Sequence, residues 1–286
     1  MTAVTIVHVS DLHFGGVANL EVVEQFQSYV PTLGAAAIVI SGDVAQRARH
    51  GEFQAARALV RRLAETAPTL LVPGNHDVQW WRSPLGLLGK RPIYGKFRQY
   101  FGETLAPVLH LPGAIIAGAV SAHGLALGSL TLNPNDLTVK GHLPRAETIR
   151  LRTIFDAAPP GHARVAVVHH NVLRGELSRR MGLSHWRSAQ RRLRETGADL
   201  VLCGHDHQDG AGQIGGVLAV STANTLSNRS REARPCSFNV VRVDDERIQV
   251  EHHRWRSEAR EFQRSDLSAF ARQRPARAPA GSQVHA

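Results

Sequence analysis

The sequence predicts an α/β fold with a largely parallel or mixed β-sheet, and three observations lead to this prediction. Short apolar runs rich in Val and Ile alternate with longer amphipathic stretches, which is the pattern of strands joined by crossover helices. Five of these apolar runs are followed within three residues by Asp, Asn or His. A hydrophobic fraction of 43% in 286 residues is that of an ordinary globular chain, which can bury one sizeable core or two modest ones.

The predicted strands are the short apolar runs bounded by polar or turn-forming residues. In chain order they are Thr5–Val9, Ala37–Ile40, Leu70–Val72, Ala114–Val120, Leu125–Leu130, Val165–Val168, Leu200–Cys203, Val217–Val220, Phe238–Val243 and Ile248–His252. The predicted helices are the amphipathic stretches Leu20–Tyr29, Gly51–Thr66, Tyr94–Phe101, Arg145–Ala157 and Trp186–Thr196. Residues 1–270 are predicted to form a single domain. Residues 271–286, rich in Arg, Pro and Ala, are expected to be a disordered tail because they bury too little apolar surface to fold.

Charge and cysteine content narrow the class of protein. A formal net charge of +10 suits an anionic substrate, a membrane surface or nucleic acid, and it does not choose among them. The N-terminus lacks the basic start and apolar stretch of a secretory signal, and no apolar run is long enough to span a bilayer, so a cytoplasmic protein is expected. Two cysteines are too few for a disulfide framework.

Side chains that commonly bind metals follow five predicted strands at the point where each strand ends. Because the carboxyl ends of strands in an α/β sheet line the crevice where ligands bind, residues placed there by different strands can converge on one point. A glycine immediately precedes three of these groups and permits a tight turn and a close backbone approach. In extended backbone, two side chains with one residue between them point to the same face, as Asp11 and His13 would, and His205 and His207. The five groups are Asp11-Leu12-His13, Asp43, Asn75-His76-Asp77, His169-His170-Asn171 and His205-Asp206-His207.

Each of these motifs alone is a weak signal, since Gly-Asp and Gly-Asn are also common turn sequences. The five motifs in one fixed order are much more specific. In this order, from Asp11 to His207, they resemble the calcineurin-like metallophosphoesterase superfamily. The stretch after the Asn-His-Asp motif, through Pro92 to Phe101, and residues 222–239 look like the bacterial branch of class III cyclic-nucleotide phosphodiesterases. The resemblance implies a four-layer αββα sandwich of two mixed β-sheets flanked by helices, with a dinuclear metal site at the carboxyl ends of strands. The residue pattern alone also allows a single doubly wound sheet.

The resemblance also implies a role for each matching position in binding two divalent metal ions. The ligands it assigns are Asp11, His13 and His207 for the first ion, Asn75, His169 and His205 for the second, and Asp43 as the bridge. His170 is expected just behind these ligands, and Asn171 departs from the Pro often found at that position. The mixture of carboxylate, imidazole and amide donors suits Mn²⁺, Fe²⁺/Fe³⁺ or Zn²⁺ better than Ca²⁺.

Such a pair of ions would make the protein a phosphoester hydrolase. Two ions roughly 3.5–4 Å apart can activate a water as hydroxide and stabilise the attacking and leaving oxygens of an in-line displacement. His76 follows the ligand Asn75 and by resemblance would donate a proton to the phosphoryl or leaving oxygen, with Asp77 orienting its ring. Loss of His76 is expected to reduce the rate more than the metal content.

Two further segments are candidates for contacts with an anionic phosphoester substrate. Trp80 and Arg82 begin an aromatic and basic stretch that could stack a base and bind phosphate, although the tryptophans could equally pack against a helix. Arg229 and Arg231 could bind phosphate through bidentate contacts, or they could belong to a solvated hairpin loop.

The leading interpretation is a metal-dependent phosphodiesterase that hydrolyses a small nucleotide-type diester, with 3',5'-cyclic nucleotides among the candidates. One alternative is a pyrophosphatase acting on a nucleotide-linked lipid precursor of the UDP-diacylglucosamine type, because the Arg-rich stretch from Leu183 to Arg194 could meet a membrane surface. A nuclease is permitted by the positive charge but not favoured, since no additional domain is evident. A non-catalytic metal-binding scaffold is the last alternative, and the presence of His76 speaks against it. The sequence leaves the oligomeric state open.

Overall fold

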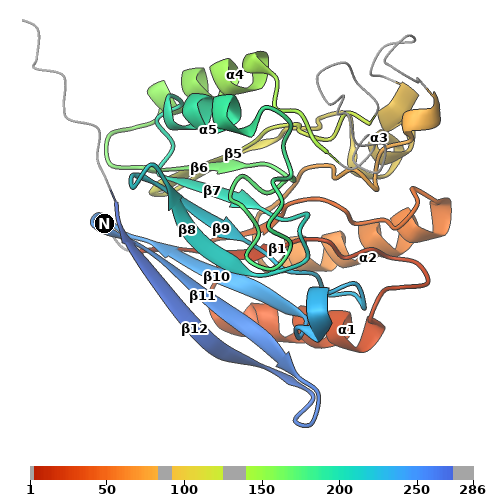
Figure 1. Ribbon diagram of the computed structural model, residues 1–286. Helices are drawn as coiled ribbons and strands as arrows, with labels where there is room; N and C mark the ends of the chain where they lie inside the picture. The colour runs from red at the N-terminus through yellow and green to blue at the C-terminus, as the bar shows by residue number, and fades with distance from the viewer. Residues whose placement is uncertain (1–2, 83–91, 125–139, 273–286) are drawn as a thin grey trace, which may run out of the picture.

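Two β-sheets packed face to face form the centre of the protein (Figure 1). The structure, a computed structural model, describes residues 3–82, 92–124 and 140–272. The first sheet has the strand order β12-β11-β10-β1-β2-β3, and the second has the order β4-β5-β6-β7-β9-β8. Each sheet contains parallel and antiparallel pairs, and helices cover the outer face of each. The four-layer arrangement implied by the resemblance is therefore confirmed, and the single doubly wound sheet is excluded.

The first sheet joins strands from the two ends of the described chain. On one side, β1 (Val4–Val9), β2 (Ala37–Ile40) and β3 (Thr69–Leu71) pair in parallel. On the other side of β1, β10 (Ser237–Val243), β11 (Arg247–Arg256) and β12 (Glu261–Ala271) continue the sheet in antiparallel pairs. Because β1, β2 and β3 are parallel neighbours, the loops that follow them emerge at the same edge of the sheet.

The second sheet has a parallel centre and antiparallel edges. β5 (Ala114–Gly118), β6 (Ala163–Val167), β7 (Leu200–Cys203) and β9 (Leu218–Thr222) are parallel neighbours. β4 (Val108–Leu111) and β8 (Gly210–Ile214) add to the two sides in antiparallel pairs. The loops after β6 and β7 therefore also leave from one edge.

The helices cover the outer faces and begin and end close to the predicted positions. α1 (Leu20–Tyr29) and α2 (His50–Thr66) pack on the first sheet, and α4 (Arg145–Asp156) and α5 (Trp186–Arg194) pack on the second. A short helix, α3 (Gly95–Phe101), packs against α2. The 3-10 segments are η1 (Val30–Leu33), η2 (Trp80–Arg82), η4 (Pro92–Tyr94) and η7 (Arg231–Ala233).

Apolar side chains fill the space between the layers in three main clusters. One cluster lies between the sheets and includes Ile6, Val39, Val165 and Val241. The other two lie under α1 and α2 and under α4 and α5. Because β2 and β7 are covered on both faces, all of their residues are buried and they read in the sequence as continuous apolar runs.

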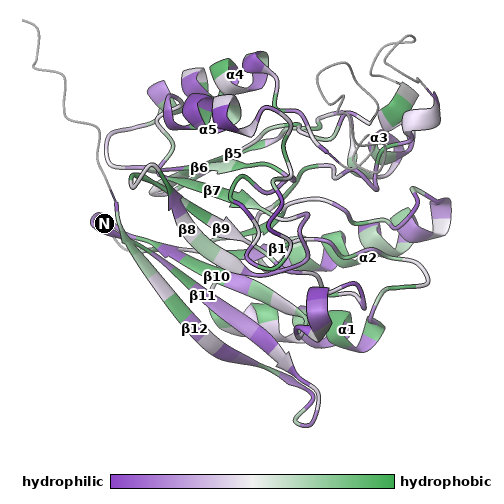
Figure 2. Cartoon of the chain, in the orientation of Figure 1, coloured by the Kyte–Doolittle hydropathy of each residue, from purple (hydrophilic) through white to green (hydrophobic). Residues whose placement is uncertain are grey.

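Three strands were missed by the sequence analysis, and all three lie at the edges of the sheets. They are β4, β8 and β12. An edge strand is only partly covered, so it carries polar residues or glycine in place of a continuous apolar run. β12 mixes hydrophilic and hydrophobic residues along its length (Figure 2), and β8 has the sequence Gly-Ala-Gly-Gln-Ile.

The described structure extends two residues beyond the predicted domain boundary at residue 270. Ala271 belongs to β12, and the largely buried side chain of Arg272 donates to the carbonyl oxygens of Gly161 and His162 and pairs with Asp199 at 3.2 Å. The rest of the predicted tail, residues 273–286, lies outside the described residues, as does the predicted strand Leu125–Leu130. No helix in the described ranges is long and apolar enough to cross a membrane.

Candidate metal centre

Loops from both sheets meet at one edge of the sandwich and bring the seven predicted ligands together. The backbone N–H of Asp11 donates to the carbonyl oxygen of Gly42 at 3.0 Å, which joins the loops after β1 and β2. In the second sheet, the N–H of Gly204 donates to the carbonyl oxygen of His169 at 2.8 Å. The seven residues are Asp11 and His13 after β1, Asp43 after β2, Asn75 after β3, His169 after β6, and His205 and His207 after β7.

The backbone in these loops is left-handed at most of the predicted ligands, which corrects one prediction. The expectation that pairs separated by one residue lie in extended backbone is wrong. Such a conformation costs roughly 1–3 kcal/mol for a residue with a side chain, so it persists only where surrounding contacts hold it. The positive φ angles are 55° at Asp11, 47° at His13, 54° at Asp43, 75° at His205 and 51° at His207.

Two of the glycines permit close approach between loops. A Cβ atom on Gly74 would lie 2.1 Å from Oδ1 of Asp43, and one on Gly204 would lie 1.9 Å from Oγ of Ser10. Neither position can carry a side chain without displacing a neighbouring loop. The predicted role of glycine before the ligands is therefore confirmed at these positions.

The first metal cluster comprises Asp11, His13, Asp43 and His207, whose candidate ligand atoms all lie within 4.8 Å of one another. Nε2 of His13 lies 2.9 Å from Nε2 of His207, and Oδ1 of Asp11 lies 3.2 Å from the latter atom. Within the described part of the chain, Oδ1 of Asp11 is buried and accepts no hydrogen bond. A buried carboxylate oxygen facing two imidazole nitrogens is a donor set that suits a divalent cation.

The second metal cluster comprises Asn75, His169 and His205. Oδ1 of Asn75 lies 3.0 Å from Nε2 of His169 and 2.9 Å from Nδ1 of His205. Asp43 lies between the two clusters, because its Oδ2 is 3.3 Å from Nε2 of His169 and 3.9 Å from Nε2 of His13. The arrangement fits the predicted bridging position of Asp43.

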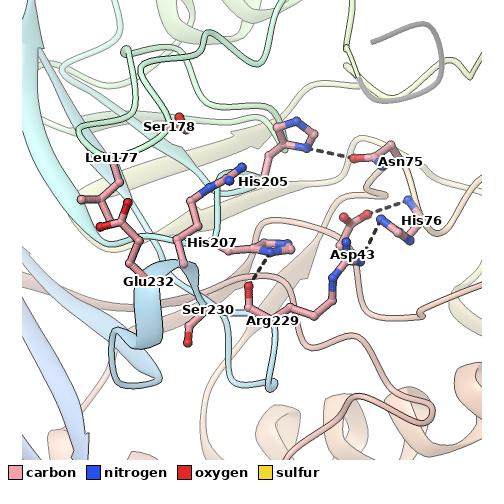
Figure 3. A pocket seen from close by; sticks show the side chains of 11 residues that line it. Asp43, Asn75, His76, Leu177, Ser178, His205, His207, Arg229, Ser230 and Glu232 are labelled. Atoms are coloured by element: carbon pink, nitrogen blue, oxygen red, sulfur yellow. Dashed lines mark hydrogen bonds between the residues drawn. The ribbon is translucent and has the colours of Figure 1, made fainter. Parts of the chain in front are cut away.

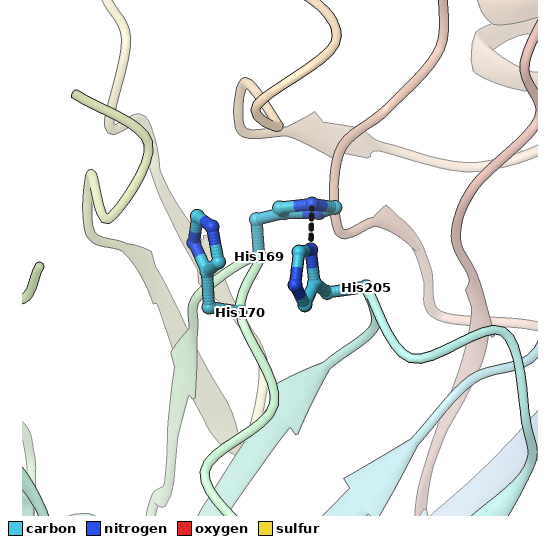
Figure 4. Close-up of side chains that lie close together, drawn as sticks. All are labelled: His169, His170 and His205. Atoms are coloured by element: carbon cyan, nitrogen blue, oxygen red, sulfur yellow. Dashed lines mark hydrogen bonds between the residues drawn. The ribbon is translucent and has the colours of Figure 1, made fainter. Parts of the chain in front are cut away.

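His170 lies beside the second metal cluster but points toward another partner. Its ring centroid is 4.4 Å from that of His205, close enough for the three histidines to form a possible ligand group (Figure 4). However, Nδ1 of His170 is 2.9 Å from Oγ of Ser121, whereas Asn75 offers its oxygen directly to the other two rings. We therefore place Asn75 in the cluster and His170 behind it.

Electrostatics favour the protonation state that a metal requires at three of the buried side chains, Asp11, Asp43 and His205. Burial favours the neutral form of Asp43, but the imidazoles of His169 and His76 outweigh it and hold the pKa of Asp43 below its usual range. Burial likewise opposes ionisation of Asp11, but the nearby imidazoles of His13 and His207 outweigh it and hold the pKa of Asp11 below its usual range. Burial, with His169 adding to the shift, lowers the pKa of His205 to about 3. The site thus combines two ionised carboxylates with neutral His205.

Backbone carbonyl oxygens orient two of the imidazole rings. Nδ1 of His169 lies 2.8 Å from the carbonyl oxygen of Ser41, and Nδ1 of His207 lies 3.0 Å from that of Arg229. In a neutral ring, a proton on Nδ1 donates to the carbonyl and leaves the Nε2 lone pair free toward the cluster. Burial opposes protonation of His169, but Asp43 outweighs this effect and raises the pKa of His169 to about 9, so a metal ion would have to displace a proton from this ring. Such carbonyl partners have no signature in the sequence, because every residue offers one.

His76 lies at the edge of the first metal cluster, and its ring stands nearly perpendicular to that of His13. Its backbone N–H donates to Oδ1 of Asp43 at 2.8 Å, and its Nδ1 lies 2.7 Å from the carbonyl oxygen of Gln46. Nε2 of His76 is 3.1 Å from Nη1 of Arg229 (Figure 3). The group that orients His76 is therefore the Gln46 carbonyl.

The predicted role of Asp77 in orienting the His76 ring is wrong. The Asp77 carboxylate is fully buried and accepts backbone N–H groups from Gly74 at 2.9 Å, Ala45 at 2.8 Å and Val44 at 3.3 Å. Burial, with repulsion from Asp43, raises the pKa of Asp77 to about 7. Asp77 instead ties the loops after β2 and β3 together, which only the folded arrangement of the two loops reveals.

Three of the four predicted substrate residues line one of two neighbouring cavities. Arg229 and Arg231 line a cavity of about 470 Å³ over the metal clusters (Figure 3), although Arg231 is paired with Asp206 at 3.0 Å. Trp80 lines an adjacent cavity of about 510 Å³, and Arg82 lines neither. The alternative prediction for Trp80 was a packing role. Trp80 does pack against the apolar cluster that contains Val78.

The sequence profile of the calcineurin-like phosphoesterase family matches residues 4–209, which contain all seven predicted ligands. The chain belongs to this family. As a calcineurin-like phosphoesterase it is a hydrolase of phosphoric ester bonds, and its cofactor is a pair of divalent metal ions that the buried Asp and His residues fit. No curated protein matches the chain in sequence.

Solved structures share the fold of this calcineurin-like phosphoesterase. A purple acid phosphatase from yellow lupin (Lupinus luteus) aligns with a TM-score of 0.66 and 11% identity over 94% of this chain and 54% of that one. A dimetal phosphatase from Danio rerio aligns with a TM-score of 0.65 and 11% identity over 94% and 99%. The structure of PhoD aligns with a TM-score of 0.67 and 8% identity over 95% and 70%. This chain spans about half the length of the lupin enzyme, and at such identities the likeness shows the fold alone.

Proposed function

We propose that this calcineurin-like phosphoesterase is a phosphodiesterase that hydrolyses a small nucleotide-type diester, 3',5'-cyclic nucleotides being among the candidates. The observation that carries the proposal is that two cavities meet at Asn75 and His76, beside the metal clusters. A diester carries a substituent on each side of its phosphorus atom, so it needs space on both sides. A monoester would leave one of the cavities unused.

We further propose that the seven predicted residues bind the two ions in the predicted way. Asp11, His13 and His207 would hold one ion, Asn75, His169 and His205 the other, and Asp43 both. When bound, two such ions activate a water molecule and neutralise charge on the phosphoryl oxygens. The mixed donor set supports Mn²⁺, Fe²⁺/Fe³⁺ or Zn²⁺.

In this proposal the protein's own side chains position the diester and supply a proton. The Gln46 carbonyl accepts from Nδ1 of His76, so Nε2 is the atom directed at the substrate. In this arrangement Nε2 accepts a hydrogen bond from Arg229 and carries no proton. Nε2 would therefore first take up a proton from solvent, after Arg229 turns to the phosphoryl group, and would then pass it to the leaving oxygen as the ester bond breaks. Arg229, 3.1 Å from Nε2, offers a guanidinium beside the same point and would hold the phosphoryl group through charge-assisted hydrogen bonds.

One observation favours a second candidate, the pyrophosphatase acting on a nucleotide-linked lipid. Arg145, Arg152 and Arg191 line a groove between α4 and α5 together with Ile149, which is 55% exposed. Arginines around an exposed apolar side chain suit the surface of an anionic membrane. Activity that rises with detergent or anionic vesicles would favour this candidate. A cytoplasmic location stays a prediction for both candidates.

The deciding experiment is hydrolysis of bis(p-nitrophenyl) phosphate beside p-nitrophenyl phosphate. Metal-stripped protein would be assayed with Mn²⁺, Fe²⁺ or Zn²⁺ restored, with Asp43→Ala and His76→Ala as variants. Metal-dependent cleavage of the diester, faster than that of the monoester and lost in both variants, is expected. A preference for the monoester would contradict the proposal, and protein that binds two ions without turnover would support the scaffold interpretation. Cyclic nucleotides and nucleotide-linked lipids would then be compared as substrates.

A further inference from the structure

The cavity of about 510 Å³ beside His76 has a chemical character distinct from that of the metal clusters. We call it the basic pocket. Among its described lining residues are the cations Arg47, Arg49 and Lys96 and the indoles Trp80 and Trp81, and none of these lining residues is a carboxylate. The pocket shares Asn75 and His76 with the cavity over the metal clusters, so a ligand can extend from one into the other.

The fold directs the two arginine side chains away from internal partners. The Glu52 carboxylate, which is largely buried at the start of α2, accepts the backbone N–H groups of Arg47 at 2.7 Å and Arg49 at 3.1 Å. Glu52 therefore holds the loop by its backbone. Both arginine residues are exposed, and within the described chain neither side chain makes an ion pair. Uncompensated guanidinium groups at a cavity favour a bound anion.

The third cation is held in place by the same loop. Nζ of Lys96, on α3, donates to the carbonyl oxygen of Ala48 at 3.1 Å. This hydrogen bond uses one of the three ammonium protons and leaves others for a ligand. The pocket therefore presents positive charge from two separate elements, the loop before α2 and the helix α3.

The two tryptophans at the pocket differ in their surroundings. Trp80 packs against the apolar cluster of Val78, Ile93 and Tyr94. Trp81 is 51% exposed, and its ring stands nearly perpendicular to that of Trp80 with centroids 6.0 Å apart. Trp80 is thus part of the support, while Trp81 offers an open aromatic face on which a planar ring can stack.

We infer that the basic pocket binds the leaving-group side of the substrate and selects a planar aromatic group that carries a second anionic group, such as a nucleotide with a further phosphate. The inference rests on the proposed function, because His76 lines the pocket and the group that His76 protonates must extend past it. A 3',5'-cyclic nucleotide has a single phosphate, which the metal clusters would occupy. The substrate class that uses the whole site is therefore a nucleotidyl diester or anhydride with an additional phosphate.

The test measures binding of adenosine 3',5'-bisphosphate and of AMP to the metal-loaded full chain by isothermal titration calorimetry. The bisphosphate is expected to bind about tenfold more tightly than AMP, since the second phosphate gains charge-assisted contacts. The double variant Arg47→Ala/Arg49→Ala is expected to abolish this preference. The control Arg57→Ala/Arg61→Ala removes the same charge from α2 outside the pocket and is expected to retain it. Trp81→Ala is expected to weaken the binding of both nucleotides but not the binding of inorganic phosphate.

Two outcomes separate this inference from the proposed function. Turnover of bis(p-nitrophenyl) phosphate by the wild-type chain, together with equal binding of bisphosphate and AMP, would overturn the inference alone. Absence of turnover, together with a bisphosphate preference that depends on Arg47 and Arg49, would overturn the proposed function and with it the leaving-group assignment, but the selection of a second phosphate by the basic pocket would stand. A preference retained in the Arg47→Ala/Arg49→Ala variant would also overturn the inference, because the second phosphate would then bind elsewhere.

Discussion

The two metal clusters differ in how much negative charge each contributes to its cation. The first metal cluster has a carboxylate of its own, Asp11, in addition to the shared Asp43, whereas the second offers the neutral amide of Asn75 and two imidazoles. Since cation affinity rises with the number of anionic ligands, we expect the first cluster to hold its ion more tightly. We therefore expect this dinuclear centre to combine a firmly bound ion with an exchangeable one.

The largest effect is expected from Asp43→Asn, because this carboxylate lies against both clusters and its loss weakens both of them. Removing one partner of a buried charged group costs about 3–5 kcal/mol, which corresponds to on the order of 10³-fold in metal affinity. The amide oxygen can still accept the His76 N–H, so the local fold should persist. Metal analysis of the desalted protein measures the effect. Two ions retained at wild-type stoichiometry would show that Asp43 is not the bridge.

His76→Ala is expected to lower the rate without affecting either cluster. Loss of a general acid costs about 10²-fold or more in kcat, while both ions should remain bound. His110, exposed on β4, provides the control, and His110→Ala should match the wild type in both respects. Turnover and metal content would be measured on the same samples. A fall in metal content as large as that of Asp43→Asn would remove His76 from the proposed proton-donor role.

Asn75→Ala is expected to weaken metal binding at the second cluster alone. The variant is expected to bind its second ion about 10–100-fold more weakly, because the amide oxygen lies within 3.0 Å of both imidazoles. Titration of the wild type with a chelator should release the two ions in separate steps, and the variant should lose only the weaker one. Equal weakening of both ions, or a single release step in the wild type, would contradict the comparison.

Asp77→Asn examines the connection between the loops that carry Asp43 and Asn75. An amide can accept on one atom only and places its NH₂ against a backbone donor, so stability should fall by about 1–3 kcal/mol. Asp244 provides the control, since its carboxylate likewise accepts backbone N–H groups, from Glu246 and Arg247, but in an exposed turn. Thermal unfolding of both variants checks the difference. A smaller loss for Asp77→Asn than for Asp244→Asn would argue against its role between the loops.

The smallest effect at neutral pH is expected at His8, which lies on β1 under the first cluster. Burial lowers the pKa of His8 from 6.5 to about 3, so the folded chain keeps it neutral while the unfolded chain takes up a proton. The stability from this histidine is therefore present above pH 6.5 and is lost as pH falls toward 3, at up to about 1.4 kcal/mol per pH unit. His8→Asn should reduce the slope of unfolding free energy against pH in this window. An unchanged slope would show that His8 is protonated in the fold.

Much of the fold and of the metal site could be predicted because the relevant signals are local. A strand covered on both faces, such as β2 or β7, must be apolar throughout, and the metal-binding side chain that follows it stands out in the sequence. The edge strands β4, β8 and β12 lacked this signal because they are only partly covered. The helices were placed correctly because their apolar residues recur at the helical period and so mark the buried face.

The sequence by itself determined which residues are available for chemistry, namely an ordered set of Asp, Asn and His residues at the carboxyl ends of five strands. Only the tertiary structure decided what their neighbours do. Asp77 holds two loops, the Gln46 carbonyl orients His76, and Arg47 and Arg49 face a cavity beside it. The physical reason is that these relations depend on backbone groups and on loops that meet in space, and hydrogen bonds between distant backbone groups leave no trace in residue identity.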